Sequence, residues 1–421
     1  MATARRGVRK SIFDPVHGGI VLEGVSLELV GHRAFQRLWG IRQTGLAHLV
    51  FPGANHTRLE HSLGVYSVAR TMAERLGLDD ASAARVAAGG LLHDLGHAPF
   101  SHTLEPTLRE VTGAGHEARS RATIVGEGPG ALGTGPGPSV AEILERHALD
   151  PRQVADLVDP DGAAPPPLLR AMLHGAIDAD RIDYLQRDAH YTGVAHGAID
   201  AARLIDTVRA TRSRLVFAEK GRHAVEGFLV GRALMYSSVY YHKTVRAAEV
   251  MAQAAVERLP GYPAAARPLL DGTDGDLLAA LRSAGGRPAE LGRGLLERRL
   301  HKRVVGWKSL SPEERRSLRS LARHPADRRA REDELSERIA APPGSVLFDL
   351  AGLDARESTG ADWSEVGVGG GGQVVYPFRP PSVWRSLAIR PPSVWAASLY
   401  VDPRFRADAE RRLRRRAAVF G

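Results

Sequence analysis

The sequence predicts a mostly α-helical (all-α) fold with small β accessories and an α+β appendage at its C-terminal end. Apolar residues recur at spacings of three and four through much of residues 26–110, which is the pattern of one face of a helix. The same spacing returns in later segments: 139–149, 167–190, 199–211, 224–258, 275–283, 288–304, 311–322 and 325–340. Short apolar segments with strand character lie between or after these helices, at 214–218, 345–350, 374–378 and 397–401.

The composition predicts a protein with a sizeable core and no membrane segment. Hydrophobic residues make up 43% of the 421 residues, enough for one large domain with an appendage, or for two domains. No stretch approaches the ~20 uncharged apolar residues of a membrane helix. The first residues also lack the apolar region of a secretory signal. We therefore expect a cytoplasmic protein.

Charge and cysteine content restrict the chemistry. The net charge is +9 and the pI is about 10.1, so the protein attracts polyanions such as nucleotides and nucleic acids. An arginine-rich composition inherited from a GC-rich genome would produce the same charge. The chain has no cysteine, which excludes thiolate ligands and disulfides. Any metal ion must therefore be held by His, Asp and Glu, a ligand set that suits Mn, Fe, Zn or Ni.

Turn-forming residues divide the chain. Pro15 and Gly18-Gly19 predict a strand or hairpin over residues 11–25. Residues 112–139 contain many Gly and Pro residues, and we expect part of this stretch to be a mobile loop. The almost pure glycine of 366–373 predicts a flexible segment. Three parts are predicted from these boundaries: a core over 1–260, a helical extension over 261–345 and a C-terminal segment over 346–421.

The C-terminal segment has two further features. The hexapeptide RPPSVW occurs at 379–384 and again at 390–395, which we interpret as a local duplication because two copies are too few for a solenoid. Asp402 and Pro403 supply an N-cap and a first-turn proline, and so predict the start of a final, very basic helix over 403–416. This helix is a candidate contact for nucleic acid.

Histidine and aspartate are concentrated in three helical segments, 55–65, 91–105 and 176–188. His93 and Asp94 are adjacent at the end of an apolar helical stretch, just before Gly96. Consecutive helical residues point about 100° apart, so both side chains reach one ion only near a helix end or bend. One such pair could arise by chance, but the two partner segments favour a metal centre that is open to water and phosphate.

A resemblance to the HD superfamily rests on HTRLEHSLGV, LLHDLGHAPFSH and DADRIDYLQRD, which resemble its H…HD…D signature. More narrowly, these segments resemble the deoxynucleoside triphosphate (dNTP) triphosphohydrolases, which include bacterial dGTPases. FDPVHGGI at 13–20, residues 35–62 and YYHKTVRAAE at 240–249 are similar to that family in order and spacing. The resemblance covers residues 11–260 and weakens beyond. It implies an HD-domain helical core that hydrolyses a dNTP, with dGTP a candidate, to deoxynucleoside and tripolyphosphate.

Carried over position by position, the resemblance implies roles for individual residues. The implied metal ligands are His61, His93, Asp94 and Asp180. The implied acid–base group is His102, with Glu105 and His116 completing a proton relay. The implied substrate contacts are Gln43, Arg58, His97, Arg181, Tyr184, Asp188, Arg232, Tyr240 and Lys243. Arginine and lysine suit the phosphates, the tyrosines and the aspartate belong near the nucleoside, and Mg²⁺ on the triphosphate is a further expected ion.

The resemblance also implies partners and leaves alternatives open. Members of the family form homo-oligomers, and Asp14 falls in a segment that lies near a nucleotide-effector site in some of them. Tyr241 stands where a vertebrate member has a glutamine near the base, so base preference stays open. Another HD phosphohydrolase (a nucleotidase, a phosphodiesterase or a nuclease) would share the metal motif. A nucleic-acid-binding regulator with a vestigial site is the alternative from a different class, and the basic tail favours it.

Overall fold

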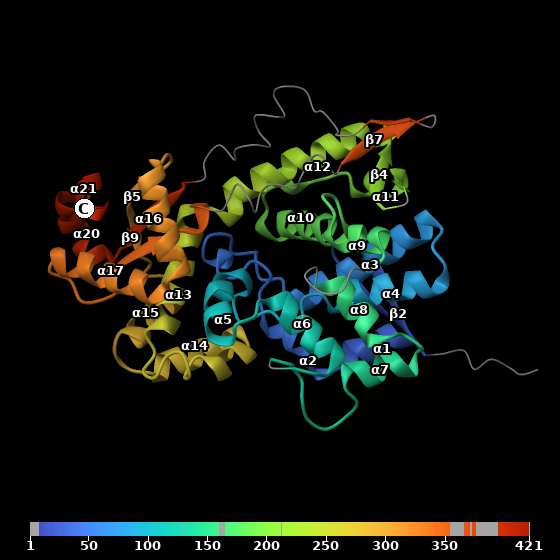
Figure 1. Ribbon diagram of the computed structural model, residues 1–421, viewed down its shortest axis with the longest axis horizontal. Helices are drawn as coiled ribbons and strands as arrows, with labels where there is room; N and C mark the ends of the chain where they lie inside the picture. Colours follow the sequence, from blue (N-terminus) through green and yellow to red (C-terminus); the bar gives the residue numbers. More distant parts are fainter. Residues whose placement is uncertain are drawn as a thin grey trace, which may run out of the picture.

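The computed structural model describes residues 8–128, 130–159, 165–211, 213–353, 366–370, 373–375 and 395–420. Helices dominate, and three small sheets accompany them (Figure 1), so the predicted mostly α-helical class is confirmed. Within these described ranges, no helix is both long and apolar enough to span a lipid bilayer.

The first part of the chain forms a β-hairpin followed by helices. β1 (Arg9–Asp14) pairs antiparallel with β2 (Gly18–Glu23), which confirms the hairpin predicted around Gly18-Gly19. The helices that follow are α1 (Val25–Gly31), α2 (Arg33–Gln36), α3 (Arg58–Leu76), α4 (Asp80–Leu92), α5 (Glu105–Thr112), α6 (His116–Val125), α7 (Val140–Arg146), α8 (Pro151–Val158), α9 (Pro167–His174) and α10 (Ala179–Thr192).

The second part adds further helices and two more sheets. Its helices are α11 (Ala201–Thr207), α12 (Arg222–Met235), α13 (Lys243–Glu257), α14 (Asp274–Ser283), α15 (Gly286–Leu296), α16 (Pro312–Arg323), α17 (Pro325–Arg338), α20 (Arg406–Arg412) and α21 (Arg416–Phe420). Its strands are β3 (Val208–Ala210), β4 (Leu215–Ala218), β5 (Lys302–Trp307), β6 (Val346–Asp349), β7 (Gly367–Gly370), β8 (Gln373–Val375) and β9 (Ala397–Val401).

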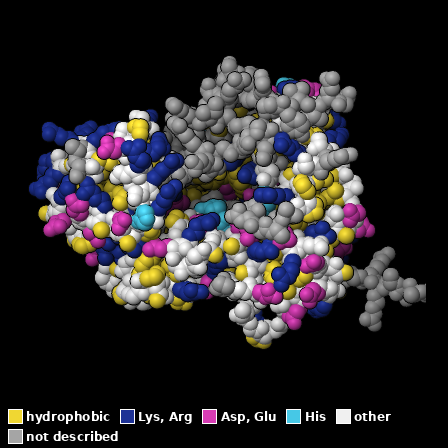
Figure 2. All heavy atoms as spheres, viewed as in Figure 1, with side chains coloured by type: hydrophobic (Ala, Val, Ile, Leu, Met, Phe, Trp, Pro, Cys, Tyr) yellow, Lys and Arg dark blue, Asp and Glu magenta, His cyan; other side chains and the backbone are white. Residues whose placement is uncertain are grey.

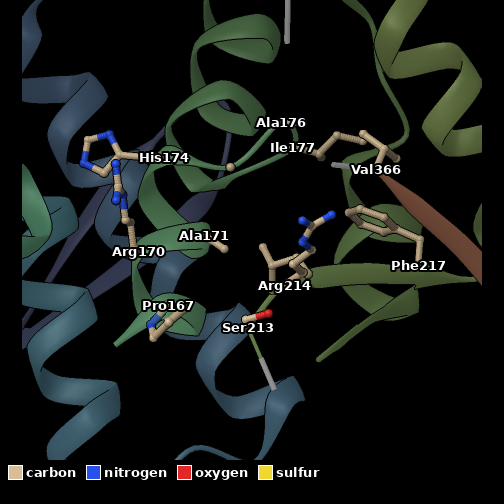
Figure 3. A pocket seen from close by; sticks show the side chains of 12 residues that line it. Pro167, Arg170, Ala171, His174, Ala176, Ile177, Ser213, Arg214, Phe217 and Val366 are labelled. Atoms are coloured by element: carbon tan, nitrogen blue, oxygen red, sulfur yellow. The ribbon is translucent and has the colours of Figure 1, made fainter. Parts of the chain in front are cut away.

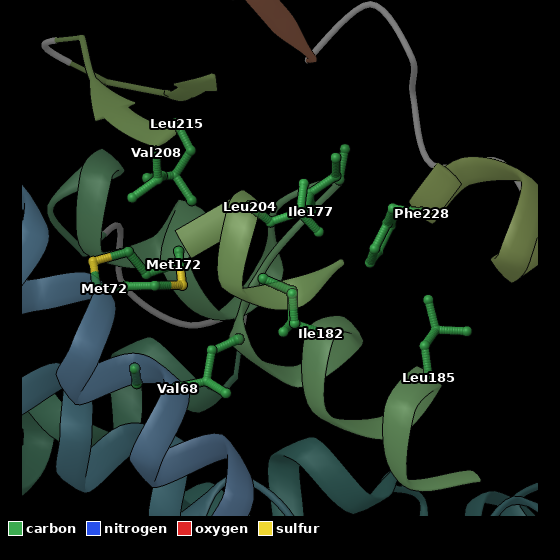
Figure 4. Packing of buried hydrophobic residues seen from close by; sticks show 14 of the residues in the cluster. Val68, Met72, Met172, Ile177, Ile182, Leu185, Leu204, Val208, Leu215 and Phe228 are labelled. Carbon is green, nitrogen blue, oxygen red and sulfur yellow. The ribbon is translucent and has the colours of Figure 1, made fainter. Parts of the chain in front are cut away.

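Helices α3, α10 and α12 contribute to the same large apolar cluster (Figure 4). Val68 of α3, Ile182 of α10 and Phe228 of α12 are all buried in it. Burying a side chain of this size contributes roughly 1.5–3 kcal/mol. The cluster therefore holds α3 against α10, and these two helices carry His61 and Asp180.

Helix α4 ends where the sequence pattern predicted. Its last residue is Leu92, and His93 is the C-cap residue, so the chain turns at the HD pair. Gly96 allows this turn to touch α6, because a side-chain carbon at Gly96 would lie 2.1 Å from the backbone oxygen of His116. The close approach brings the start of α6 against the end of α4.

The structure corrects two of the expected elements and adds a helix that was not predicted. Within 112–139 it adds α6, because the glycines of this stretch lie on either side of that helix and not inside it. The helix expected over 288–304 stops at Leu296, and β5 follows because it pairs with β9. Within the glycine segment 366–373, β7 lies parallel to β4, and its Val368 is buried in the same apolar cluster as Phe217 of β4.

The C-terminal appendage is α+β, as predicted. β9 lies between β5 and β6 and is antiparallel to both, and Leu318 of α16 and Leu335 of α17 pack into the same apolar cluster as these strands. The helix expected over 403–416 is divided: Asp402 caps a short 3₁₀ turn, and α20 and α21 follow. Figure 2 shows Lys and Arg side chains gathered over this end of the molecule. Nucleic-acid binding at this surface stays a prediction.

Packing is continuous across the expected boundary near residue 260. Leu104 of the 3₁₀ turn before α5, Val250 of α13, Leu291 of α15 and Tyr400 of β9 share one apolar cluster. This shared cluster joins parts on both sides of residue 260. The division into 1–260, 261–345 and 346–421 stays a prediction. The RPPSVW repeat lies outside the described residues, apart from Trp395.

Candidate active site

Four side chains from three helices meet at one point. His61 comes from α3, His93 and Asp94 from the end of α4, and Asp180 from the first turn of α10. Nitrogen and oxygen atoms of His61, His93 and Asp94 lie within 4.8 Å of one another. Asp180 Oδ1 lies 3.0 Å from His61 Nε2 and 3.9 Å from His93 Nε2. The structure thus brings together all four residues predicted as metal ligands.

The donor atoms of this cluster fit a divalent metal ion. The Nε2 atoms of His61 and His93 are buried and make no hydrogen bond within the described structure. Burial alone would lower the pKa of His61, but the carboxylates of Asp180 and Asp183 outweigh it and raise the pKa to about 10. Carboxylates that stabilise the protonated His61 imidazole in this way also favour a metal cation in place of that proton. Two imidazoles and two carboxylates suit Mn, Fe, Zn or Ni.

A buried chain of charged side chains orients His61 from behind. Asp183 Oδ2 lies 2.7 Å from His61 Nδ1, so the opposite nitrogen, Nε2, faces the metal cluster. Asp183 also accepts two hydrogen bonds from Arg187, which in turn donates to Asp14. A hydrogen bond to the second ring nitrogen fixes the orientation of a metal-ligating imidazole. Asp14 therefore has a structural contact here, and its role near an effector stays a prediction.

Removal of the Asp183 carboxylate is expected to destabilise the fold by about 3–5 kcal/mol, because Arg187 and His61 lose their shared buried partner. Urea unfolding of Asp183→Ala measures this loss. Asp206→Ala is the matched control: it removes an exposed carboxylate that pairs with Arg75, and should cost under about 1 kcal/mol. Equally small losses in both variants would show that the buried chain contributes little to the stability of α10.

Arg58 lies inside the protein, one helical turn before His61 on α3, and is 3% exposed. Its Nη1 donates to Asp94 Oδ2 at 2.7 Å, and its Nε donates to Ser101 at 2.8 Å. Although burial opposes this effect, Arg58 and the neighbouring histidines hold the pKa of Asp94 well below its usual range. Asp94 is therefore charged, as a metal ligand must be, and Arg58 lies next to any phosphate that reaches the metal.

Three imidazoles lie beside the metal cluster. The rings of His97 and His116 stack with centroids 3.9 Å apart and 13° between their planes, and His102 meets both edge-on. Ligand nitrogens of His97, His102 and His116 lie within 4.8 Å of one another, so this trio is a second group that could hold a metal ion. Burial lowers the pKa of His97 well below its ordinary value, and the charge of Arg58 lowers it further. His97 is thus a neutral group.

The expected His–carboxylate–His relay is only partly assembled. Glu105 Oε2 lies 3.1 Å from His116 Nδ1, and this carboxylate raises the pKa of His116 against the opposing effect of burial. Within the described chain, no hydrogen bond joins Glu105 to His102. His102 instead lines the cavity with a solvent-exposed side chain. The protein around it and the positive charges of Arg58 and His116 lower its pKa. The carboxylate therefore contacts His116 and not His102.

The residues predicted near the sugar form another part of the wall. The rings of Tyr184 and Tyr240 meet edge-on, and the Tyr240 hydroxyl donates to Asp188 Oδ2. The other Asp188 oxygen lies 2.8 Å from His56 Nε2. Tyr240 ends a π-helical turn over Tyr236–Tyr240 that links α12 to α13, a local conformation that is frequent at functional sites. His56 begins the HTRLEHSLGV segment but was assigned no role, and the sequence did not predict this turn.

These groups open into one cavity of about 480 Å³, a size typical of small-molecule sites. The predicted residues that line it are Gln43, Arg58, His93, Asp94, His97, His102, His116, Asp180, Arg181, Tyr184, Asp188, Arg232 and Tyr240. His61, Glu105 and Lys243 are not part of the lining. His61 is fully buried, whereas Lys243 is exposed to solvent at the first residue of α13.

Arg246 lines the cavity one helical turn after Lys243, and it was not among the predicted residues. Its guanidinium binds Asp349 of β6, with one bond of 2.8 Å, and pairs with Glu249. Because Asp349 belongs to the C-terminal appendage, this ion pair joins the appendage to the cavity wall. The sequence did contain an indication of Arg246, because it lies within YYHKTVRAAE, three positions after Lys243, which was predicted as a substrate contact.

Two protein-family models match the chain. The HD domain model matches residues 58–188, and the HD associated region model matches residues 199–375. The first range contains the whole four-residue metal cluster. A solved structure of a hypothetical protein from Aquifex aeolicus is 27% identical in sequence and similar in fold, with a TM-score of 0.73 over 97% of this chain and 100% of that one.

Proteins that are similar in sequence include uncharacterized proteins and dNTP triphosphohydrolases. The uncharacterized protein YwfO of Bacillus subtilis is 38% identical over 245 residues, which cover 56% of this chain and 53% of that protein. Human deoxynucleoside triphosphate triphosphohydrolase SAMHD1 is 31% identical over 236 residues, 48% of this chain and 36% of that protein. The chain thus spans about half or less of the length of these relatives. It belongs to the HD-domain superfamily, within the group that includes the dNTP triphosphohydrolases.

Proposed function

We propose that this protein hydrolyses a dNTP to deoxynucleoside and tripolyphosphate. The observation that carries the proposal is one cavity that combines a four-ligand metal cluster, buried cationic side chains and a tyrosine–carboxylate pair suited to a sugar. The name of the human relative supports the same substrate class. A metal ion held by His61, His93, Asp94 and Asp180 would act as a Lewis acid on the α-phosphate.

Three arginines of the cavity are proposed to bind the triphosphate. Each has a protein partner that restrains it: Arg58 binds Asp94, Arg181 binds the N-cap residue of α10, and Arg232 donates to Tyr184. Cations that are held in place before the substrate arrives stabilise the charge of the transition state without further reorganisation. Lys243 is less suited to this role, because it lies outside the cavity.

His102 is the proposed proton donor. Water attacks the α-phosphorus, the bond from phosphorus to the 5′-oxygen breaks, and that oxygen takes a proton from His102, so the deoxynucleoside leaves neutral. The low pKa of His102 belongs to the substrate-free cavity. The negative charge of a bound triphosphate raises the pKa of a neighbouring imidazole, toward the range that acid catalysis needs.

Discrimination against ribonucleotides is proposed to come from the tyrosine wall. Asp188, held by His56 and Tyr240, would accept a hydrogen bond from the 3′-hydroxyl of the sugar. The ring of Tyr184 would occupy the space that a 2′-hydroxyl needs. An added hydroxyl is then penalised both by contact with the ring and by burial without a partner.

The products of the reaction test the proposal. We expect the purified protein, assayed with each of four dNTPs and four NTPs and with Mn²⁺, Fe²⁺, Mg²⁺ or Co²⁺ in turn, to release tripolyphosphate from dNTPs in one step. Chromatography of early time points identifies the first product. A dNDP or dNMP as the primary product would contradict the proposal and would favour a nucleotidase or phosphodiesterase of the same superfamily.

A further inference from the structure

The loop that carries His102 has a strained backbone. This loop, residues 95–102, leads from the HD pair into the 3₁₀ turn Ser101–Leu104. Phe100 and Ser101, the two residues before His102, have φ angles of 57° and 55°. Residues other than glycine seldom adopt such left-handed values, and they keep them only where the surrounding structure holds them. The position of His102 therefore depends on contacts that hold this loop.

Asp274, the first residue of α14, supplies such contacts. Its Oδ1 accepts a hydrogen bond of 2.7 Å from the backbone nitrogen of Phe100, 174 positions earlier in the chain. Its Oδ2 accepts a bond of 3.1 Å from the backbone nitrogen of Arg42, and the carbonyl oxygen of Arg42 accepts one of 2.7 Å from the Ser101 hydroxyl. One carboxylate is thus bonded to the first left-handed residue directly and to the second through Arg42.

The Asp274 carboxylate lies deep in the protein. The residue is 2% exposed, and burial raises its pKa to about 6 against the opposing effect of the two backbone bonds. Phe100 is also fully buried, in the same apolar cluster as Leu277 of α14. A buried carboxylate is unfavourable unless its hydrogen bonds are made, so its bond to the loop is a specific contact.

The residues just before Asp274 hold the beginning of the same loop. Arg37 donates to the carbonyl oxygens of Leu95 and His97, at 2.8 Å and 2.7 Å. It also donates to the carbonyl oxygen of Gly272, at 2.9 Å. The segment 271–274 is therefore connected to both ends of the loop.

We propose that Asp274 is a positioning residue for His102, the proposed proton donor. By holding the two left-handed residues, its carboxylate fixes the point at which His102 enters the cavity. Proton transfer requires the donor within hydrogen-bond reach of the leaving oxygen, so a displaced loop lowers the rate. The effect on catalysis rests on the proposed function, whereas the effect on the loop does not.

The kinetic test separates positioning from a general loss of structure. Asp274→Ala should lower kcat by at least about tenfold, because misplacing a reacting group by about 1 Å can cost about 100-fold. KM and the Kd for Mn²⁺ should stay within about twofold, because no hydrogen bond or ion pair joins Asp274 to a metal ligand among the described residues. Asp274→Asn keeps one acceptor oxygen in a side chain of the same shape, so its kcat should lie between those of Asp274→Ala and the wild type.

Hydrogen exchange of the Mn²⁺-loaded protein tests the loop without any substrate. Peptides that cover residues 98–104 should exchange faster in both variants, since the Phe100 amide loses its acceptor or shares a weaker one. Peptides from α3 and α10, which carry His61 and Asp180, should exchange as in the wild type. This pattern confines the change to the loop.

Two control variants separate the loop contact from other effects. Asp276→Asn weakens the capping box of the same helix, where this carboxylate accepts from Thr273. Arg170→Ala changes a neighbouring cavity of about 320 Å³, in which Figure 3 shows Arg170 beside His174, a residue that also lines the main cavity. Both controls should keep the kcat and the loop exchange of the wild type.

Three results would overturn the inference. The first is unchanged exchange at 98–104 in Asp274→Asn, which also decides the matter if Asp274→Ala does not fold. The second is faster exchange in α3 and α10 together with weaker Mn²⁺ binding, which would show a general structural role. The third is a faster-exchanging loop with unchanged kcat. A wild-type protein that hydrolyses no dNTP would contradict the proposed function, and the exchange data would still decide whether Asp274 holds the loop.

Discussion

His93→Ala is expected to lose bound metal and dNTP hydrolysis together. The substitution removes one of four ligands, and His93 is the C-cap residue of α4 outside the apolar clusters, so helical content should stay near that of the wild type. Loss of a hydrogen-bonded partner of a metal ligand already costs roughly 10–100-fold in affinity or activity. Loss of a ligand itself should therefore lower activity by more than about 100-fold. Asp94→Ala should act similarly, with the added disturbance that Arg58 loses its partner.

Metal content by mass spectrometry, hydrolysis rate and far-UV circular dichroism on the same preparation check this result. His190→Ala is the matched control, because His190 is an exposed histidine of α10 that does not line the cavity. It should keep both metal and activity. Full activity in metal-depleted His93→Ala protein would contradict the assigned centre. Normal metal content with no activity would move His93 from ligand to substrate contact.

His102→Ala is expected to lower kcat by about 10²–10⁴-fold, the usual contribution of acid–base catalysis. The metal bound at the four-residue cluster should not change, because His102 is not one of its ligands. KM should change little, since proton transfer to the leaving oxygen matters mainly in the transition state. Metal analysis and single-turnover kinetics on one preparation separate the roles. Lost metal would identify a ligand, and an unchanged rate would identify a bystander.

Glu105→Gln is expected to cause a smaller loss than His102→Ala. In the structure the carboxylate pairs with His116, and it acts on His102 through its charge without a hydrogen bond. The loss of rate in Glu105→Gln should be largest at a pH at which catalysis requires protonated His116, because Glu105 raises the pKa of His116. A loss as large as that of His102→Ala would indicate that Glu105 contacts His102 directly once substrate is bound.

The metal cluster was predictable because three separate segments resemble the HD signature, and parts of that signature are local. Arg58 and His61 are one helical turn apart, and the helix end at the HD pair follows from the residues around Gly96. By contrast, the Asp188–His56 pair joins positions 132 residues apart, and Arg246–Asp349 joins positions 103 apart. No spacing pattern encodes such contacts, because they depend on how distant helices pack. The same limit explains why an exposed lysine was chosen on α13 instead of the arginine one turn later.

The helix α6 was missed for a related reason. Counting glycines over 112–139 averages the helix with the segments on either side of it, and only tertiary contact shows that His116–Val125 forms one structured unit. The hairpin and the appendage strands β6 and β9 were recovered, because short apolar segments and turn residues mark them directly, whereas β5 was missed.

The buried ion chain behind His61 has a consequence for how the protein is made. Asp14 belongs to the N-terminal hairpin, whereas Arg187 is synthesised 173 residues later. A nascent chain that has released the HD pair from the ribosome therefore still lacks Asp180, Asp183 and Arg187. The metal ion cannot nucleate local structure around the HD pair as it is made, and loading must follow the docking of α10 onto α3. Metal uptake during synthesis would thus report that this long-range docking has occurred.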